Sequence, residues 1–193
     1  MSTRLETARL VIRTFEPRDA GAWVAMFSDP QVRRFLPGPA PTMQTFQGAL
    51  EGRHAMEREA GYAMWAVEEK KTGTFAGQCG LRPVESVGPP AQATPAAGRT
   101  SGEFDLAYHF TRACWNKGYA TEAAIAVLAH GLGPLGLGCV IAVAMPDNIG
   151  SWKVMEKAGM RYAGLADYYG LTGLKKYIAE PGWWRVPPGS SDA

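Results

Sequence analysis

The stretch from Arg112 to Gly131 constrains the fold more than any other part of the chain, because a polar turn runs directly into a long apolar segment. From Tyr119 onward the residues are mostly alanine, isoleucine, valine and leucine at helical spacing. This composition predicts a helix that begins near Gly118 and is buried over much of its surface. The rest of the chain must therefore build a core around this helix.

The start of this helix has the features of an anion site. The first backbone N–H groups of a helix have no partner within it, and the aligned peptide dipoles put partial positive charge there. Gly118 and Ala120 would allow close approach to the backbone, and Lys117 adds a positive charge. A phosphate or pyrophosphate is the expected ligand. An ordinary helix start, capped by Asn116 and complemented by Glu122, is the alternative.

Length and composition exclude several classes of protein. The 193 residues suit one domain, expected over residues 1–185, with a disordered tail at 186–193. The net charge of +2 gives no broad basic field, so no nucleic-acid partner is expected. Cys79, Cys114 and Cys139 lack paired metal-site spacing, so free thiols and no metal are expected. The absence of a signal peptide and of any membrane-spanning apolar run predicts a cytoplasmic protein without a membrane partner.

Apolar patterns along the chain predict an α/β fold with a mixed sheet. The expected strands cover residues 10–15, 62–69, 74–81, 103–110, 139–144, 160–167 and 174–179. The expected helices cover residues 17–28, 31–36, 42–59, 149–158 and the segment from about 118 to the turn at 134–138. Residues 86–102, rich in Pro, Gly, Ala and Ser, predict a flexible loop. The apolar run at 139–144 predicts a strand parallel to 103–110, joined to it through the long helix.

Three short words in the sequence resemble those of one family. The word WNKGYATE at residues 115–122 is similar to the coenzyme A pyrophosphate loop of the GNAT superfamily of acetyltransferases, in the form found in the ribosomal-protein N-terminal acetyltransferase (RimJ/RimL-type) branch. The word DLAY at residues 105–108 resembles the family's fourth-strand word. The segment from Asn148 to Met160 resembles its N-x-x-S…E-K-x-G-F motif. The likeness runs from Leu5 to about Trp184.

The resemblance implies acetyl transfer from acetyl-CoA to a primary amine. The implied GNAT fold has a central, mixed but mostly antiparallel, twisted sheet of about six to seven strands, with helices on both faces. A splayed parallel pair of strands in that sheet holds coenzyme A. The residues implied to bind acetyl-CoA are Tyr108, Phe110, Trp115, Asn116, Lys117, Gly118, Tyr119, Ala120, Thr121, Asn148 and Ser151. No metal is implied.

Acetyl transfer requires a group that removes a proton from the amine. Asp105 stands where the family word carries its Glu and is the first candidate for this base. Glu103, two residues earlier on the same strand face, is the second. Because Asp is shorter than Glu, we expect a bridging water rather than direct contact. A solvated strand edge without catalytic function is the alternative for both carboxylates, and His54, a lone histidine among glutamates, is expected to be a surface group.

The departing thiolate benefits from a proton donor. Many members of the family place a Tyr in the helix after Asn148, but the matching residue here is Met155, which cannot donate. The role passes to Ser151 as first candidate, to Tyr177, or to solvent. A purely structural role for Ser151, as a hydrogen-bonding residue of a helix start, is the alternative.

The sequence leaves the amine acceptor open. A protein or peptide N-terminus, an amino acid, a polyamine and an amine-bearing antibiotic all fit, and the branch resemblance favours an α-amine. The acceptor pocket should be walled by residues 27–41, residues 86–102 and the final hairpin. A non-catalytic acyl-CoA-binding sensor module is the alternative function. A homodimer is compatible with the family.

Overall fold

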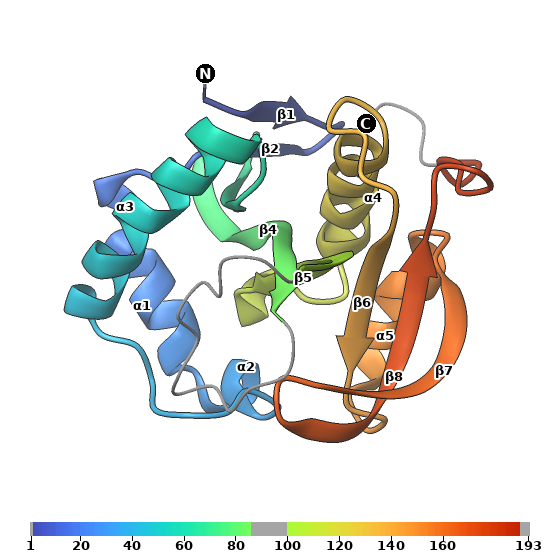
Figure 1. Cartoon of the computed structure of the whole chain (residues 1–193). Coiled ribbons are helices and arrows are strands. Elements are labelled where there is room, and N and C mark those ends of the chain that lie inside the picture. Colours follow the sequence, from blue (N-terminus) through green and yellow to red (C-terminus); the bar gives the residue numbers. More distant parts are fainter. Residues whose placement is uncertain (1, 86–99, 190–193) are drawn as a thin grey trace.

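The computed structural model describes residues 2–85 and 100–189. Most of the expected flexible loop therefore lies outside the described residues, while residues 100–102 open a strand. Within the described part the chain forms one mixed sheet with helices on both faces (Figure 1). None of the described helices has the length and apolar character needed to cross a bilayer.

The sheet has eight strands in the order β1-β2-β3-β4-β5-β6-β8-β7. The strands are β1 (Arg4–Glu6), β2 (Leu10–Arg13), β3 (Met64–Glu69), β4 (Thr74–Glu85), β5 (Thr100–Phe110), β6 (Val140–Ala144), β7 (Arg161–Tyr168) and β8 (Leu171–Ala179). Neighbours in this described sheet are antiparallel except β5 and β6, which run parallel. The parallel pairing expected from the apolar run at 139–144 is confirmed.

Helices cover both faces of the sheet. They are α1 (Ala20–Ser28), α2 (Pro30–Arg33), α3 (Met43–Ala60), α4 (Tyr119–Leu132) and α5 (Ile149–Lys157), with 3-10 turns at η1 (Pro17–Asp19) and η3 (Arg112–Cys114). Figure 1 shows α1 and α3 together on one side, and α4 and α5 on the other. The long helix expected from about residue 118 is therefore confirmed as α4, and it follows β5 directly.

Two apolar clusters, one on each face, hold these layers together. The larger lies under α4, where Ala123, Val127 and Leu128 are fully buried. The smaller joins α1 and α3 to the opposite face and includes Trp23 and Phe46. Burial of such side chains is the main favourable contribution to folding, so the sheet is fixed from both sides.

Alternation along β4 and β5 gives the two faces of the sheet different characters. On the α4 face, Cys79, Leu81 and Leu106 belong to the larger apolar cluster. The opposed pairs that point the other way are Gln78–His109, Gly80–Ala107 and Arg82–Asp105. The α1 face of these strands is therefore polar at both ends, with only small residues between.

Local signals placed several helix ends correctly. The Thr42 side chain accepts a hydrogen bond from the N–H of Thr45 at the start of α3, and Gly61 ends this helix at φ 77°. Asn148 caps α5 by accepting from Ser151 N–H, and Gly159 follows that helix at φ 78°. These boundaries confirm the helices expected over residues 42–59 and 149–158, because a polar side chain favours a helix start and a glycine with positive φ favours its end.

Other boundaries differ from the expectations. Strand β1 was not expected, because three residues at a sheet edge are too few to show alternation. Strand β4 continues past the expected end at residue 81, with an irregular register near Pro83. Strand β8 starts at Leu171, directly after the two-residue turn Tyr169-Gly170, whose φ angles are 57° and 73°. Positive φ at both positions is typical of the tightest β-hairpins.

Gly80 of β4 lies very close to the backbone at the start of β3. A Cβ atom at Gly80 would lie 2.1 Å from the Ala63 carbonyl oxygen and 2.5 Å from the Met64 Cα. We expect Gly80→Ala to lower the free energy of unfolding by about 3 kcal/mol, because backbone atoms of β3 must move. Urea denaturation measures this change.

The matched control is Gly52→Ala in the middle of α3, where a new Cβ would meet no atom within 4 Å. This exposed substitution should raise the free energy of unfolding by up to about 1 kcal/mol, because alanine favours the helix. Equal free energies of unfolding for the two variants would contradict the close approach of β3 to Gly80.

Candidate active site

The central feature of the site is a gap between the two parallel strands. Strands β5 and β6 pair at Phe104–Val140 and Asp105–Ile141, and then diverge. Beyond this point residues 106–110 of β5 stay paired with β4 on one side but have no strand partner on the other. Their backbone groups on that side face the gap and can hydrogen-bond an elongated ligand.

The start of α4 offers unpaired donors. Gly118 stands at the helix start with φ 81°, and no side chain caps the helix. Its first intrahelical bond runs from Glu122 N–H to the Gly118 carbonyl, so the N–H groups of Tyr119, Ala120 and Thr121 remain available. The alternative in which Asn116 caps this helix is wrong, since Asn116 instead takes a positive φ of 60° in the preceding turn. The arrangement suits a phosphate group.

Arg9, in the turn between β1 and β2, holds this helix start in place. Its guanidinium donates to the Lys117 carbonyl at 2.8 Å and to a Glu122 carboxylate oxygen at 2.7 Å. The same guanidinium lies 4.7 Å from the centre of the Tyr119 ring. Sequence reasoning missed Arg9 because its partners lie 108 and 113 residues away along the chain.

Several residues of the expected coenzyme-binding set reach the site only through their backbone. Phe110 is buried in the larger apolar cluster. The Tyr119 side chain is also buried, and its hydroxyl donates to Glu69. Trp115 is 41% exposed and donates from Nε1 to the Phe110 carbonyl at 2.9 Å. Its exposed ring is therefore held at the end of β5.

Tyr108 and Ser151 meet on the α5 side of the gap. The Tyr108 hydroxyl donates to the Ser151 carbonyl at 2.8 Å and lies 3.1 Å from Ser151 Oγ. Burial raises the pKa of Tyr108, so its hydroxyl stays protonated. Since that proton is directed at the carbonyl, the Ser151 hydroxyl is the donor in the second contact. Asn148 caps the same helical turn, accepting from Ser151 N–H at 3.4 Å.

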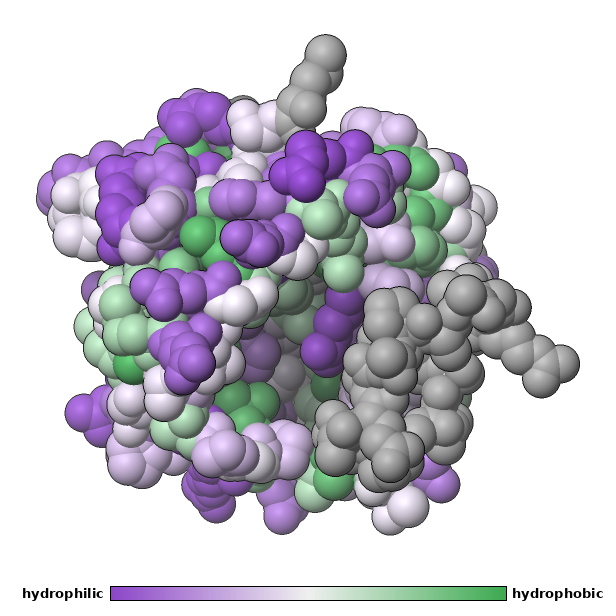
Figure 2. All heavy atoms as spheres, turned by 60° about the vertical axis from the view of Figure 1, so that its left-hand side comes forward, coloured by the Kyte–Doolittle hydropathy of each residue, from purple (hydrophilic) through white to green (hydrophobic). Residues whose placement is uncertain are grey.

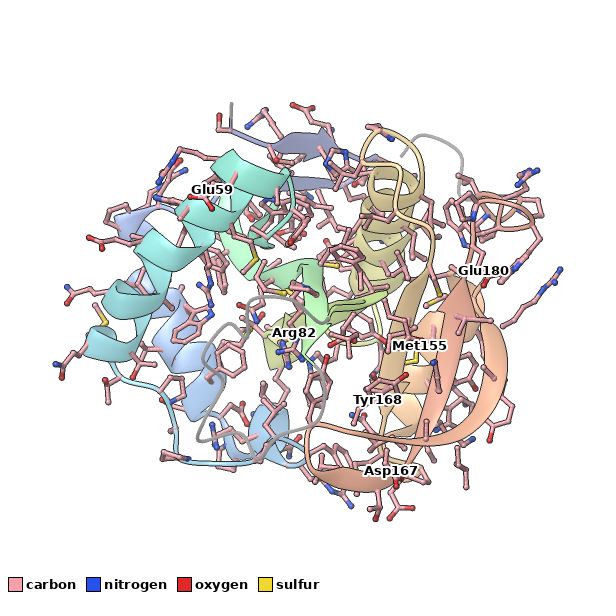
Figure 3. The ribbon with its side chains drawn as sticks, in the orientation of Figure 1. Glu59, Arg82, Met155, Asp167, Tyr168 and Glu180 are labelled. Carbon is pink, nitrogen blue, oxygen red and sulfur yellow. The ribbon has the colours of Figure 1, made fainter. Side chains whose placement is uncertain are left out.

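Met155, at the position of the family's Tyr, and Tyr177, the second candidate for the proton-donor role, make other contacts. Met155 is 1% exposed, within the larger apolar cluster, and Figure 3 shows it beside β6 and β8. The Tyr177 hydroxyl donates to Glu156 at 2.9 Å. Burial and that carboxylate raise the pKa of Tyr177 to about 12. Of the two candidates for this role, only Ser151 makes a hydrogen bond with Tyr108 within the described residues.

Asp105 is part of a polar cluster that the sequence did not reveal. Its Oδ2 accepts from Arg82 at 2.8 and 3.0 Å and from the Tyr169 hydroxyl at 2.8 Å. The Arg82 guanidinium also lies 4.7 Å from the centre of the Tyr169 ring. In Figure 3 the Arg82 side chain lies in the middle of the molecule, between α2 and the β7–β8 hairpin. Asp105 is 3% exposed, so the alternative of a solvated strand edge is wrong for this residue.

Glu103 faces the same hairpin. Its carboxylate accepts from Lys176 at 2.6 Å and from the Tyr168 hydroxyl at 3.1 Å. His54 is partly buried rather than a surface group, because its Nε2 lies 2.8 Å from the Phe15 carbonyl. Among the described residues no group of acidic, His or Cys side chains is arranged to hold a metal ion.

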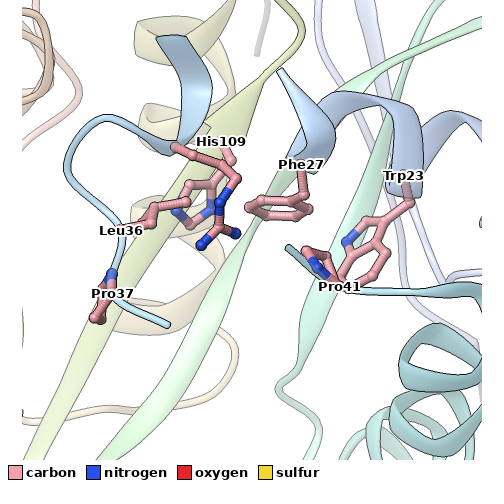
Figure 4. Close-up of a pocket in the computed structure, with 7 residues that line it drawn as sticks. Trp23, Phe27, Leu36, Pro37, Pro41 and His109 are labelled. Carbon is pink, nitrogen blue, oxygen red and sulfur yellow. The ribbon is translucent and has the colours of Figure 1, made fainter. Parts of the chain in front are cut away.

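A pocket of about 220 Å³ opens on the α1 face of the sheet (Figure 4). Its lining residues are Trp23, Phe27, Arg33, Leu36, Pro37, Pro41 and His109. Figure 2 shows this side of the molecule hollowed near its centre. The stretch at residues 27–41, expected to wall the acceptor pocket, supplies most of this lining, whereas residues 86–99 lie outside the described residues. His109 was not among the expected site residues, although it lies four residues after Asp105 on β5 and therefore on the same strand face.

Comparison with known proteins gives a consistent result. Residues 9–161 match a family model described as an acetyltransferase (GNAT) domain. The Bacillus subtilis protein YkkB is 33% identical over 162 residues, which cover 83% of this chain and 87% of YkkB.

Two solved structures show the same fold at low sequence identity. The ribosomal-protein-S5-alanine acetyltransferase of Vibrio fischeri has a TM-score of 0.74 at 14% identity, over 95% of this chain and 99% of its own. Mycobacterium smegmatis RimJ in complex with CoA-disulfide has a TM-score of 0.71 at 19% identity, over 94% of this chain and 87% of its own.

The Arg9 contacts generate a prediction for ligand binding. We expect Arg9→Ala to weaken acetyl-CoA binding about tenfold, or ~1.4 kcal/mol, because the start of α4 loses both a positive charge and its link to β1 and β2. Calorimetric titration with acetyl-CoA measures the loss. Arg4→Ala is the control, since Arg4 pairs with the exposed Glu6 on its own strand and with no other residue of the described ranges. An equal effect of the two substitutions would contradict the assignment.

Proposed function

We propose that this chain, which belongs to the GNAT family of acetyltransferases, transfers the acetyl group of acetyl-CoA to the α-amine of a peptide or small amino compound. Acetyl-CoA-dependent acetyl transfer follows from the family; the acceptor and the roles of individual residues are the proposal. The observation that carries it is the uncapped start of α4 lying beside strands that separate after two paired positions.

These two features together support a position for the coenzyme. Its pyrophosphate would bind the open N–H groups at residues 119–121, with Lys117 and Arg9 adding positive charge nearby. Its pantetheine arm would lie in the gap and bond the free backbone edge of β5, as an added strand does. Asn148 and Ser151 line the α5 side of this path. The thioester would then lie close to Tyr108.

The reaction is a direct displacement at the thioester carbonyl. The neutral amine attacks the carbonyl carbon, and the developing oxyanion is stabilised by a backbone N–H of β5 that faces the gap. The C–S bond then breaks, and the thiolate takes its proton from the Ser151 hydroxyl. Tyr108, which its raised pKa keeps protonated, holds Ser151 in position, and the proton that the amine loses on attack passes through water and restores the Ser151 hydroxyl.

Asp105 acts on the amine only through water in this proposal. Its Oδ2 accepts hydrogen bonds from Arg82 and from the Tyr169 hydroxyl. A direct transfer of the amine proton to this oxygen would break those bonds. We therefore assign Asp105 and Arg82 the task of ordering water at the acceptor side, with Glu103 as a more remote charge in the same hairpin contact.

The α-amine acceptor is supported by the nature of the pocket and by one structural neighbour. The described pocket lining contains no acidic side chain that would bind the extra positive charges of a polyamine. The Vibrio fischeri neighbour is named as a ribosomal-protein-S5-alanine acetyltransferase. An N-terminal residue with a small or apolar side chain is therefore the form of acceptor we propose.

Calorimetric titration with acetyl-CoA, followed by thiol release with a panel of amines, tests the proposal. We expect binding near micromolar, about −8 kcal/mol, and thiol release that depends on an amine of the α-amino type. Binding without release for any amine would favour the acyl-CoA-binding sensor module. No binding would refute the assignment of the α4 start.

The Ser151 assignment makes a separate prediction. We expect Ser151→Ala to lower kcat about 100-fold while leaving the affinity for acetyl-CoA nearly unchanged, because the thiolate loses its proton donor. Steady-state kinetics at saturating acceptor measures this. Ser28→Ala is the control, since the Ser28 hydroxyl donates to the Val24 carbonyl of its own helix and bonds nothing else among residues 2–85 and 100–189. Unchanged kcat in Ser151→Ala would transfer the role to solvent.

A further inference from the structure

The pocket on the α1 face has a composition that restricts what it can bind. Its walls are aromatic, proline and leucine side chains, and its only polar lining side chains among the described residues are Arg33 and His109. Figure 4 shows the His109 ring next to Phe27, with ring centres 5.1 Å apart. Such a pocket suits an apolar group that carries a hydrogen-bond acceptor close to it.

The hydrogen bonds behind His109 determine which of its nitrogens carries the proton. The indole Nε1 of Trp23 can only donate, and it donates to Gln78 Oε1 at 2.8 Å. This fixes the orientation of the Gln78 amide, whose Nε2 lies 3.2 Å from His109 Nδ1. Because that amide nitrogen is a donor, Nδ1 must be the acceptor.

His109 is therefore a neutral ring with its proton on Nε2. Burial, helped by the positive charge of Arg82, lowers the pKa of His109 to about 4, which keeps the ring neutral near pH 7. Nε2 makes no hydrogen bond with any described residue. The hydrogen bonds from Trp23 to Gln78 and from Gln78 to His109 therefore leave one oriented N–H donor, Nε2–H, for the pocket. A ring nitrogen that already carries a proton cannot act as a base.

His109 also lies next to the reaction centre. It follows Tyr108 on β5, so the two side chains point to opposite faces of the same strand segment. Tyr108 faces the gap and Ser151, whereas His109 faces the acceptor pocket. A ligand held by His109 would reach the thioester from the α1 side.

We propose that His109 is a specificity-determining residue that donates from Nε2–H to a carbonyl or carboxylate oxygen adjacent to the reacting amine. The acceptor class is then an α-amino acyl unit with an apolar side chain. That side chain would occupy the pocket and contact the wall formed by α1, α2 and the following prolines. Gln78 and Trp23 are positioning residues that fix the tautomer. This inference rests on the proposed function, and it adds that the enzyme recognises the oxygen next to the reacting amine.

Two acceptors that differ in one carboxamide group test the role of His109. L-leucinamide and isopentylamine carry the same apolar group, and only the first has the carbonyl. The measured quantity is the kcat/KM for L-leucinamide divided by that for isopentylamine. Because the two amines differ in basicity, this ratio is compared between protein variants rather than interpreted by itself. We expect His109→Phe to lower this ratio about tenfold. His109→Gln, which keeps a donor near the Nε2 position, should retain most of it.

L-leucine distinguishes the two sources of the recognised oxygen. A higher kcat/KM for L-leucinamide than for L-leucine would indicate a peptide carbonyl, and the reverse would indicate the carboxylate of a free amino acid. A preference for L-leucinamide and a preference for L-leucine both support the proposal, provided that the preference is lost in His109→Phe. A ratio that is the same in wild type and His109→Phe for both oxygen-bearing acceptors would overturn it.

The tautomer is tested without turnover. In the nitrogen NMR spectrum of the wild-type protein, His109 Nε2 should carry the proton and Nδ1 should be unprotonated. Trp23→Phe removes the indole donor and should produce a mixture of tautomers and a several-fold lower acceptor ratio, while an unfolding curve shows whether the fold is kept. A proton on Nδ1 in the wild type would overturn the inference.

Product binding separates failure of this inference from failure of the proposed function. N-acetyl-L-leucinamide and N-isopentylacetamide are both uncharged, and each is titrated into the protein saturated with coenzyme A. We expect about tenfold tighter binding of the first, lost in His109→Phe. That preference without any thiol release would sustain the inference while refuting the transferase, and equal binding of the two amides in the wild type would refute the inference.

Discussion

The early end of pairing between β5 and β6 is the constraint on which the rest of the site depends. Adjacent strands normally continue their ladder, because every unpaired backbone group forgoes a hydrogen bond. Here the two strands pair at Phe104 and Asp105 of β5 and then diverge, leaving free edges that a long ligand can bond. Tyr108 reaches Ser151 of α5 beside this gap, which connects β5 to the helix on the far side.

Residues from the turns at both edges of the sheet contact the candidate active site. From one edge, Arg9 of the β1–β2 turn binds the start of α4. From the other, the β7–β8 turn brings the Tyr169 hydroxyl to the buried Asp105. Tyr169 holds a left-handed φ of 57°, which a non-glycine residue adopts only when its surroundings favour it. The site is therefore stabilised by the complete sheet rather than by one loop.

The coenzyme loop could be predicted from the sequence because its features are consecutive. Glycine, lysine and small residues at an apolar helix start describe an anion site by themselves. The surroundings of Asp105 could not be predicted, because Arg82 and Tyr169 lie 23 and 64 residues away. His109 was overlooked although alternation placed it with Asp105, since a histidine in a strand gives no sign of its partners.

The sequence by itself determined the α/β class, the parallel connection through α4 and helix ends such as Gly61 and Gly159. These features depend on backbone conformation and on side-chain periodicity within a few residues, so a single stretch of chain contains the necessary information. Only the tertiary structure decided which charges are paired and which nitrogen of His109 carries its proton. Burial and hydrogen-bond partners come from other strands and helices, and these determine protonation and donor direction.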